Sequence, residues 1–396
     1  MAGLTGGPGR QGESLMSAQL EARPRGPVAL LRTALLPGVL VATYLVVFFL
    51  VSIGVIGDYQ QTILATICIN IVLATSLNLV TGFTGQFSLG HAGFMAIGAY
   101  ATGLMTMRYP SIWGLVGGLL VGAALASVVG FLIGIPTLRL RGDYLAIATL
   151  GMAEIIRVLL LNFDFSNGAA GLNGIPRLIN WHILFIFAAC SIVLIANFLR
   201  SVHGRNTIAV REDEIAASSI GVNALWAKTL AFVIGAFFGG IAGGLYASYF
   251  YFIKPDMFGF LKSIDILIIV VLGGLGSLSG SVISAILLAL ISMKLQEYAE
   301  LRMVFYGLIL VLIMLFRPQG LFGDGELKPA MFGYLLPWRY RYVGRSKGTT
   351  RRWPAKLDRV APWHYQYTGK PSGITKEPPA AFDRLTSPRK RGGPKP

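Results

Sequence analysis

The chain has 396 residues, of which 54% are hydrophobic and 13% charged. Soluble globular proteins usually carry about a quarter charged residues, so this composition excludes an ordinary soluble domain. The net charge of +16 is unevenly placed, because about half of the Lys and Arg residues follow Phe316.

Long apolar runs with few ionisable residues follow one another between Ala34 and Phe316. Runs of about 18 or more apolar residues are typical of transmembrane helices, whereas strands of a membrane barrel alternate with period two. Because lipid cannot satisfy exposed backbone polar groups, the runs predict an all-α, polytopic transmembrane helical bundle of about ten spans. The predicted spans are residues 34–56, 61–80, 86–107, 112–135, 144–161, 182–199, 229–252, 262–276, 278–296 and 303–316.

The first span follows a basic segment, residues 1–33, and is too long for the core of a signal peptide, so we expect it to be retained. Lys and Arg residues concentrate in the loops that share a side with the N-terminus, such as Arg139, Arg200 and Arg205. This bias and an even number of spans place both termini in the cytoplasm. The expected domains are the N-terminal segment, a membrane domain over 34–323 and a basic, disordered cytoplasmic tail over 324–396.

Two Gly-rich stretches interrupt the apolar pattern at matching places, and each follows an apolar run. Interrupted helices point to a transport path, because their free backbone groups are tolerated only against protein or a water-filled cavity. The alternative is that small residues only let helices pack closely; the two stretches together favour the pathway. The pathway candidates are Gly82, Gly85, Gln86, Ser88 and His91 in the first stretch, and Gly273, Gly274, Gly276, Ser277 and Ser279 in the second.

Ionisable residues inside predicted spans are energetically costly, so each requires a partner or a role. Glu154 and Arg157 are three residues apart on one helix and are predicted to form an intramembrane ion pair. A structural pair near the membrane interface is favoured over a gate or a solute contact. His91 is predicted to be a hydrogen-bonded interior residue more readily than a proton relay.

Two connections are long enough to fold. The first, from Asn162 to Trp181, contains NGAAGLNGIP and could contact a solute-binding protein or simply join two helices. The second, residues 200–228, has Asp213 and Glu214 at a predicted helix start, where negative charge is favoured. The adjacent Ala216 and Ala217 form a flat patch that another surface can approach.

Gly221 suits the C-terminal cap of this helix, and Asn223 then caps a second short helix, Ala224–Lys228. Such a helix pair could insert into a groove on a partner or lie as an amphipathic loop on the lipid surface.

The 200–228 loop resembles the coupling loop of ATP-binding-cassette importer permeases, whose signature is Glu-Ala-Ala, three residues, then Gly. Ala216, Ala217 and Gly221 match that signature, whereas Ile215 occupies the Glu position. Which residue makes the charged contact to an ATPase therefore stays open. The candidate coupling residues are Arg211, Glu212, Asp213, Glu214, Ala216, Ala217 and Gly221.

The wider resemblance covers residues from about 70 to 323. It is carried by LNLVTGFTGQFSLGHAGFMAIGAYATGL, TLRLRGDYLAIATLGMAEIIR, VVLGGLGSLSGSVISA and LFRPQGLFG. Within the family, the chain is similar to the longer permease subunit of the branched-chain amino-acid importer, and the urea and short-amide importers have a very similar subunit.

This resemblance implies a type II-like permease fold in the bacterial inner membrane. It implies as partners a second homologous permease subunit, two cytoplasmic ATPase subunits, an external solute-binding protein and membrane lipid. It also implies that ATP and Mg bind to the partner subunits and that this chain binds no cofactor.

The sequence contains no G-x-x-x-x-G-K-[ST] nucleotide loop, metal-ligand cluster or nucleophile motif, so the chain is not expected to be an enzyme. The alternative of another class is an ion-coupled carrier, which the lack of a series of intramembrane carboxylates disfavours. No nucleic-acid recognition motif accompanies the basic tail, so anionic lipid is its expected partner.

Overall fold

The computed structural model describes residues 27–54, 56–140 and 142–295, together with 304, 307–308, 311–312, 315–316 and 320–321. Most of the predicted N-terminal segment, much of the tenth predicted span and the tail 324–396 lie outside the described residues. Within them, a helix occupies each of the first nine predicted spans. These helices are α2 (Pro27–Ser52), α3 (Asp58–Thr81), α4 (His91–Arg108), α5 (Ile112–Thr137), α6 (Asp143–Asn162), α7 (Trp181–Arg200), α10 (Ala224–Phe250), α11 (Phe260–Gly273) and α12 (Leu278–Lys294).

Five of the described helices, α3, α5, α6, α7 and α10, are long and apolar enough to cross a membrane. The helix α11 has 14 residues, a rise of about 21 Å, which is shorter than the hydrocarbon core of a bilayer. Shorter apolar stretches are Gly38–Ser52 within α2, and α12. The structure therefore confirms a polytopic helical architecture.

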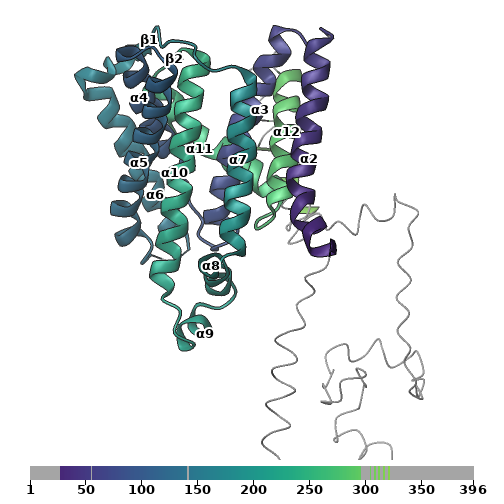
Figure 1. The fold of residues 1–396 in the computed structure, drawn as a ribbon. Coiled ribbons are helices and arrows are strands. Elements are labelled where there is room, and N and C mark those ends of the chain that lie inside the picture. The colour runs from purple at the N-terminus through teal and green to yellow at the C-terminus, as the bar shows by residue number, and fades with distance from the viewer. Residues whose placement is uncertain are drawn as a thin grey trace, which may run out of the picture. The chain divides into compact units, whose positions relative to one another are not determined.

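The short elements lie at two opposite ends of the bundle (Figure 1). At one end, β1 (Leu172–Asn173) pairs antiparallel with β2 (Phe252–Ile253), flanked by the single turns η1 (Asp164–Ser166), η2 (Gly168–Ala170) and η3 (Pro255–Phe258). At the other end, α8 (Val202–Glu212) and α9 (Glu214–Ser219) lie between α7 and α10.

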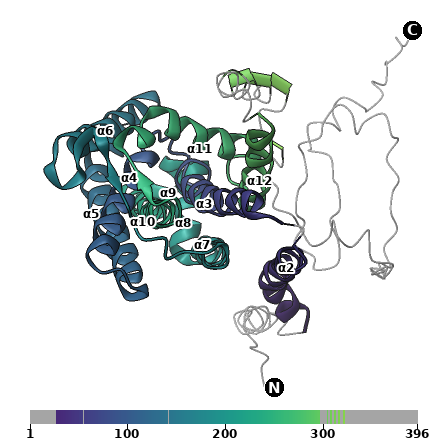
Figure 2. The same cartoon turned by 90° about the horizontal axis from the view of Figure 1, so that it is seen from above.

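The helix α10 forms the centre of the core, in contact with α3, α4 and α5 (Figure 2). Its glycines allow backbone-to-backbone approach. A Cβ atom added at Gly243 would lie 1.9 Å from the backbone oxygen of Met95, and one added at Gly98 would lie 1.9 Å from that of Gly240. Small residues are the usual means of close packing between helices in membranes.

Two predicted boundaries are wrong. The third span was expected to begin at residue 86, but α4 begins at His91 and residues 82–90 are not helical. The glycines there, including Gly85 at φ +70°, favour an irregular backbone over another helical turn. The predicted second short helix, Ala224–Lys228, is instead the start of α10, which continues without a break to Phe250.

Candidate functional site

The two Gly-rich stretches, far apart in sequence, meet in the structure. A Cβ atom added at Gly82 would lie 2.2 Å from the backbone nitrogen of Gly276, so at this point only glycine allows the contact. The buried side chain of Asn78, on the last turn of α3, joins the two. Its Nδ2 donates to the Ser277 carbonyl and to Ser281 Oγ, both at 2.8 Å, and its Oδ1 accepts from Gly276 N at 2.9 Å. We call Asn78, Gly82, Gly276, Ser277 and Ser281 the glycine joint.

Arg211, in the last turn of α8, contacts the glycine joint. Its Nη1 donates to the Gly82 carbonyl at 2.9 Å, across 129 residues of sequence. The guanidinium also pairs with Glu212, with Nη2 2.6 Å and Nε 3.1 Å from the carboxylate oxygen Oε1. The predicted loop and the predicted pathway residues are therefore in direct contact.

The LFRPQGLFG motif also reaches this region through Gly320 and Leu321, two of its four residues that the structure describes. Leu321 N donates to the Leu272 carbonyl at 2.9 Å. A Cβ atom at Gly320 would lie 2.5 Å from Gly274 Cα. Motifs near residues 82, 211, 276 and 320 thus converge on the turn between α11 and α12.

Most of the other predicted pathway residues are buried, whereas Gly85 is exposed and Ser279 is half-buried. His91 Nε2 lies 2.7 Å from Ser76 Oγ, which places it as a hydrogen-bonded interior residue. Ser277 Oγ caps α12 by accepting from Gly280 N at 3.1 Å and lies 3.3 Å from Ser279 Oγ. Ser88 Oγ accepts from Gly90 N at 3.4 Å. Gln86 is buried, and its Oε1 has no hydrogen-bond partner among the described residues.

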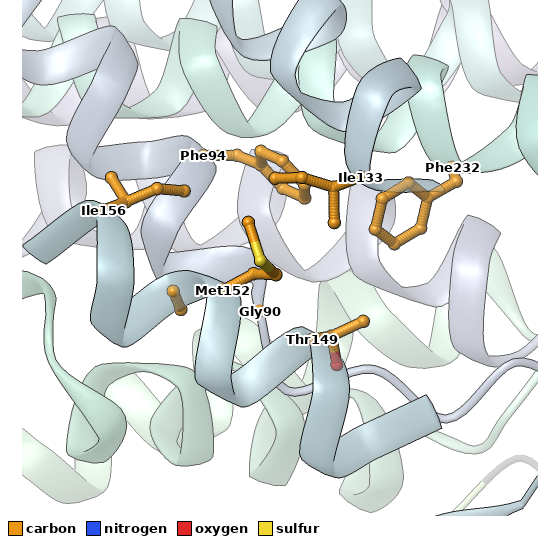
Figure 3. A pocket seen from close by; sticks show the side chains of 8 residues that line it. Gly90, Phe94, Ile133, Thr149, Met152, Ile156 and Phe232 are labelled. Atoms are coloured by element: carbon orange, nitrogen blue, oxygen red, sulfur yellow. The ribbon is translucent and has the colours of Figure 1, made fainter. Parts of the chain in front are cut away.

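A crevice lies between α4, α5, α6 and α10, where Met152 points toward Phe94 and Ile133 (Figure 3). It leaves no volume for a water molecule, so it is a packing contact in this conformation. Its lining residues are Gly90, Phe94, Ile133, Thr149, Met152, Ala153, Ile156 and Phe232.

The 200–228 loop is held by local capping interactions. Asp213 caps α9, with Oδ1 accepting from Ile215 N at 2.9 Å and Ala216 N at 3.0 Å. At the other end, Gly221 follows the helix with φ +90°. The Gly221 N–H donates to the Ser218 carbonyl and the Val222 N–H donates to the Ala217 carbonyl, both at 3.0 Å. This pair of bonds is the Schellman arrangement, which satisfies the last carbonyls of a helix.

The exposed face of α9 differs from the predicted one. Ala216 is exposed, but Ala217 is 3% exposed and packs with Val210 and Ala227, so the expectation that both alanines form an open patch is wrong for Ala217. The reason is that successive helical residues face different directions. Ile215 and Ile220 instead lie outward, 80% and 79% exposed.

An ion pair between Glu214 and Lys228, 2.9 Å apart, ties α9 to α10. These two residues, with Leu138, Arg139 and Leu225, line an open hollow of about 240 Å³ beside α9. The hollow therefore lies between α9, the end of α5 and the start of α10.

At the opposite end, Arg157 Nε lies 2.7 Å from Glu154 Oε2, as an ion pair on α6. Asp256, which the sequence did not indicate, adds a second contact, with Oδ1 3.1 Å from Arg157 Nη1. All three side chains are partly exposed, so this network links α6 to η3 at the surface.

Sequence reasoning did not identify the α10 glycines. Their signal is the i, i+4 spacing of Gly235, Gly239 and Gly243 and of Gly240 and Gly244, which places small residues along one helix face. No local signal indicates the bond from Arg211 to Gly82.

A family model described as branched-chain amino acid transport system / permease component matches residues 59–314. The chain is 36% identical over 309 residues to the high-affinity branched-chain amino acid transport system permease protein LivM of Escherichia coli K12, covering 69% of this chain and 71% of that protein. It is 26% identical over 285 residues to the corresponding permease protein LivH of the same organism, covering 65% of this chain and 92% of that protein. A probable LivM of Methanocaldococcus jannaschii is 23% identical over 309 residues, covering 63% of this chain and 89% of that protein. No solved structure matches significantly.

Proposed function

The chain belongs to the family of branched-chain amino acid transport system permease components, and on this premise we propose that it is the longer permease subunit of an ATP-driven importer of branched-chain amino acids. The observation that carries the proposal is the 36% identity to a named permease over 69% of the chain. The matched range, 59–314, extends over every described transmembrane helix except α2.

In this proposal the chain pairs with a second, homologous permease subunit. Its similarity to both LivM and LivH, two permease proteins from one organism, supports such a pair. The fold is type II-like, in the bacterial inner membrane, and both termini are cytoplasmic. A solute-binding protein delivers the amino acid to the end that carries β1 and β2.

Two cytoplasmic ATPase subunits, which hold ATP and Mg, supply the energy, and one of them grips α9. The support for this role is physical. The segment is rigid at both ends, through Asp213 and the Gly221 turn, and it presents exposed apolar side chains, Ile215 and Ile220, at one end of the bundle. A capped helix with exposed apolar residues suits insertion into a groove.

The glycine joint, in this proposal, borders the cytoplasmic end of the pathway. Its polar groups bond to one another, which favours a contact between helices over a solute-binding surface. The Glu154–Arg157 pair, bonded to Asp256 at the other end, is structural.

The test is uptake of labelled leucine in a strain that lacks the chain, complemented with wild type or with the double variant Ile215→Asp, Ile220→Asp. We expect the deletion to abolish ATP-dependent leucine uptake and the double variant to reduce uptake and ATPase co-purification at least tenfold, because two charges would enter an apolar groove. Val202→Asp, an exposed apolar residue outside α9, is the matched control.

Labelled urea is the comparison substrate. Normal leucine uptake in the deletion strain would remove the substrate assignment. Unchanged ATPase co-purification by the double variant would remove α9 as the docking segment.

A further inference from the structure

Arg211 caps a helix that belongs to the membrane core. Gly82 follows the last residue of α3, and its carbonyl is one of the groups that a helix end leaves without an intrahelical partner. The Arg211 guanidinium supplies the missing partner, because its Nη1 donates to this carbonyl at 2.9 Å. A cation at a helix C-terminus is additionally favoured by the helix dipole.

The space that Arg211 occupies depends on two glycines. A Cβ atom added at Gly276 would lie 2.6 Å from Arg211 Nη1, and one added at Gly85 would lie 3.0 Å from its Cγ. Both glycines also have left-handed backbone, φ +89° and +70°, which L side chains rarely adopt. The side chain therefore lies in a slot formed by one glycine from each Gly-rich stretch.

Arg211 is also joined to α9 over a very short distance along the chain. Glu212, its ion-pair partner, is followed directly by Asp213, the residue that caps α9. On its inner side α9 is held by Ala217 and by the Glu214–Lys228 pair. Consequently, a shift of α9 displaces the Arg211 backbone unless this turn unfolds.

On the membrane side, the glycine joint connects two helix ends. Asn78 bonds the last turn of α3 to the turn that begins α12. In the segment that follows Asn78, two buried polar atoms, Thr81 Oγ1 and Gln86 Oε1, have no partner among the described residues. Unpaired buried polar groups disfavour a conformation and gain from a rearrangement that provides partners.

We propose that Arg211 is the positioning residue that transmits displacement of α9 to the glycine joint, and so couples the ATPase to the ends of α3 and α12. This inference rests on the proposed function for the source of the displacement. The contact itself is a property of this chain alone. A planar guanidinium with several fixed N–H groups suits the role better than an ammonium group, because it bonds Gly82 and Glu212 at once.

The experiment uses the assembled transporter with its partner subunits in proteoliposomes, comparing wild type, Arg211→Ala, Arg211→Lys and Arg205→Ala. Arg205 is exposed on the same helix and serves as the charge-matched control. For Arg211→Ala we expect ATPase co-purification within about twofold of wild type and leucine uptake reduced at least about tenfold. Arg211→Lys should restore only part of the uptake, and Arg205→Ala should behave as wild type.

A second measurement, hydrogen exchange of the purified chain, needs neither substrate nor ATPase. Arg211→Ala is expected to raise exchange in peptides covering 80–86 and 274–281, with α5 unchanged as the control for correct folding. Uptake within twofold of wild type, or exchange at the joint equal to that of Arg205→Ala, would overturn the inference. So would loss of ATPase co-purification in proportion to uptake, since Arg211 would then serve assembly.

Failure of the underlying proposed function gives a different pattern. In that case wild type itself would neither take up leucine nor retain the ATPase subunits, while the exchange measurement would still decide whether Arg211 holds the joint.

Discussion

Asn78 commits its whole side-chain amide to one contact between helices that are about 200 residues apart in the chain. Both donor and acceptor atoms are used, and the side chain is completely buried. Among the bonds it makes, the one from Gly276 N is the hardest to replace. The Ser277 carbonyl, in contrast, would keep a partner without Asn78, because it also accepts from Ser281. At the residue scale, Asn78 is the polar centre of the joint.

Replacing Asn78 with Ala is expected to destabilise the protein by about 1–3 kcal/mol, the usual cost of leaving a buried donor without a partner. Thermal unfolding of the purified protein in detergent measures this change. Asn70→Ala is the control: Asn70 is buried on the same helix but makes no side-chain hydrogen bond to a described residue. Equal destabilisation by both variants would show that lost volume, and not the bonds, accounts for the effect.

Among the helices, the contact between α4 and α10 depends on missing side chains. Gly243 of α10 lies directly against the backbone of α4, and Gly240 lies against the backbone of α5. Gly151 on α6 contrasts with them: it is exposed, and a Cβ atom there would have nothing within 4 Å. Glycine is therefore required at some helical positions and incidental at others, which the residue type alone does not reveal.

The paired substitutions Gly243→Ala and Gly151→Ala test this distinction. Gly243→Ala should destabilise by at least about 1–3 kcal/mol, since the added methyl group meets fixed backbone and the two helices must separate. Gly151→Ala should be neutral or stabilise by up to about 1 kcal/mol through higher helix propensity. Midpoints of thermal unfolding in detergent give both values; a neutral Gly243→Ala would mean that α4 and α10 adjust without loss.

At the scale of the whole helical bundle, the two ends carry different elements. One end carries the 163–180 loop with β1 and β2, and the other carries α8 and α9 (Figure 1). If the proposed function is correct, a membrane separates them and only the first end is reachable from outside the cell. Arg200, Arg205 and Arg211, at the end of α7 and on α8, support this orientation through the positive-inside rule.

Cysteine labelling in intact cells measures the orientation. Cys68 and Cys190 are first replaced with Ala, and single cysteines are then introduced as Ala169→Cys in the 163–180 loop or His203→Cys on α8, both exposed positions. A membrane-impermeant maleimide should label Ala169→Cys in intact cells and His203→Cys only after permeabilisation. The reverse pattern would place α9 outside the cell and exclude an ATPase contact there.

The local features of this protein were determined by its sequence. Apolar runs located the helices, because each backbone must satisfy its own hydrogen bonds in lipid. Gly221 and Asn223 were correctly placed as caps and Asp213 at the start of α9, because caps and helix ends depend on residues only two to four positions away. The pairing of Glu154 with Arg157 is predictable for the same reason, since both lie on one turn of one helix.

Only the tertiary structure decided what these elements touch. The inward direction of Ala217, the addition of Asp256 to the ion pair and the bond from Arg211 to Gly82 all depend on neighbours supplied by other segments. Such contacts arise from packing between helices, where a one-position rotation exchanges a buried face for an exposed one. Composition and residue spacing do not show which way each helix is rotated about its axis, so they did not predict these contacts.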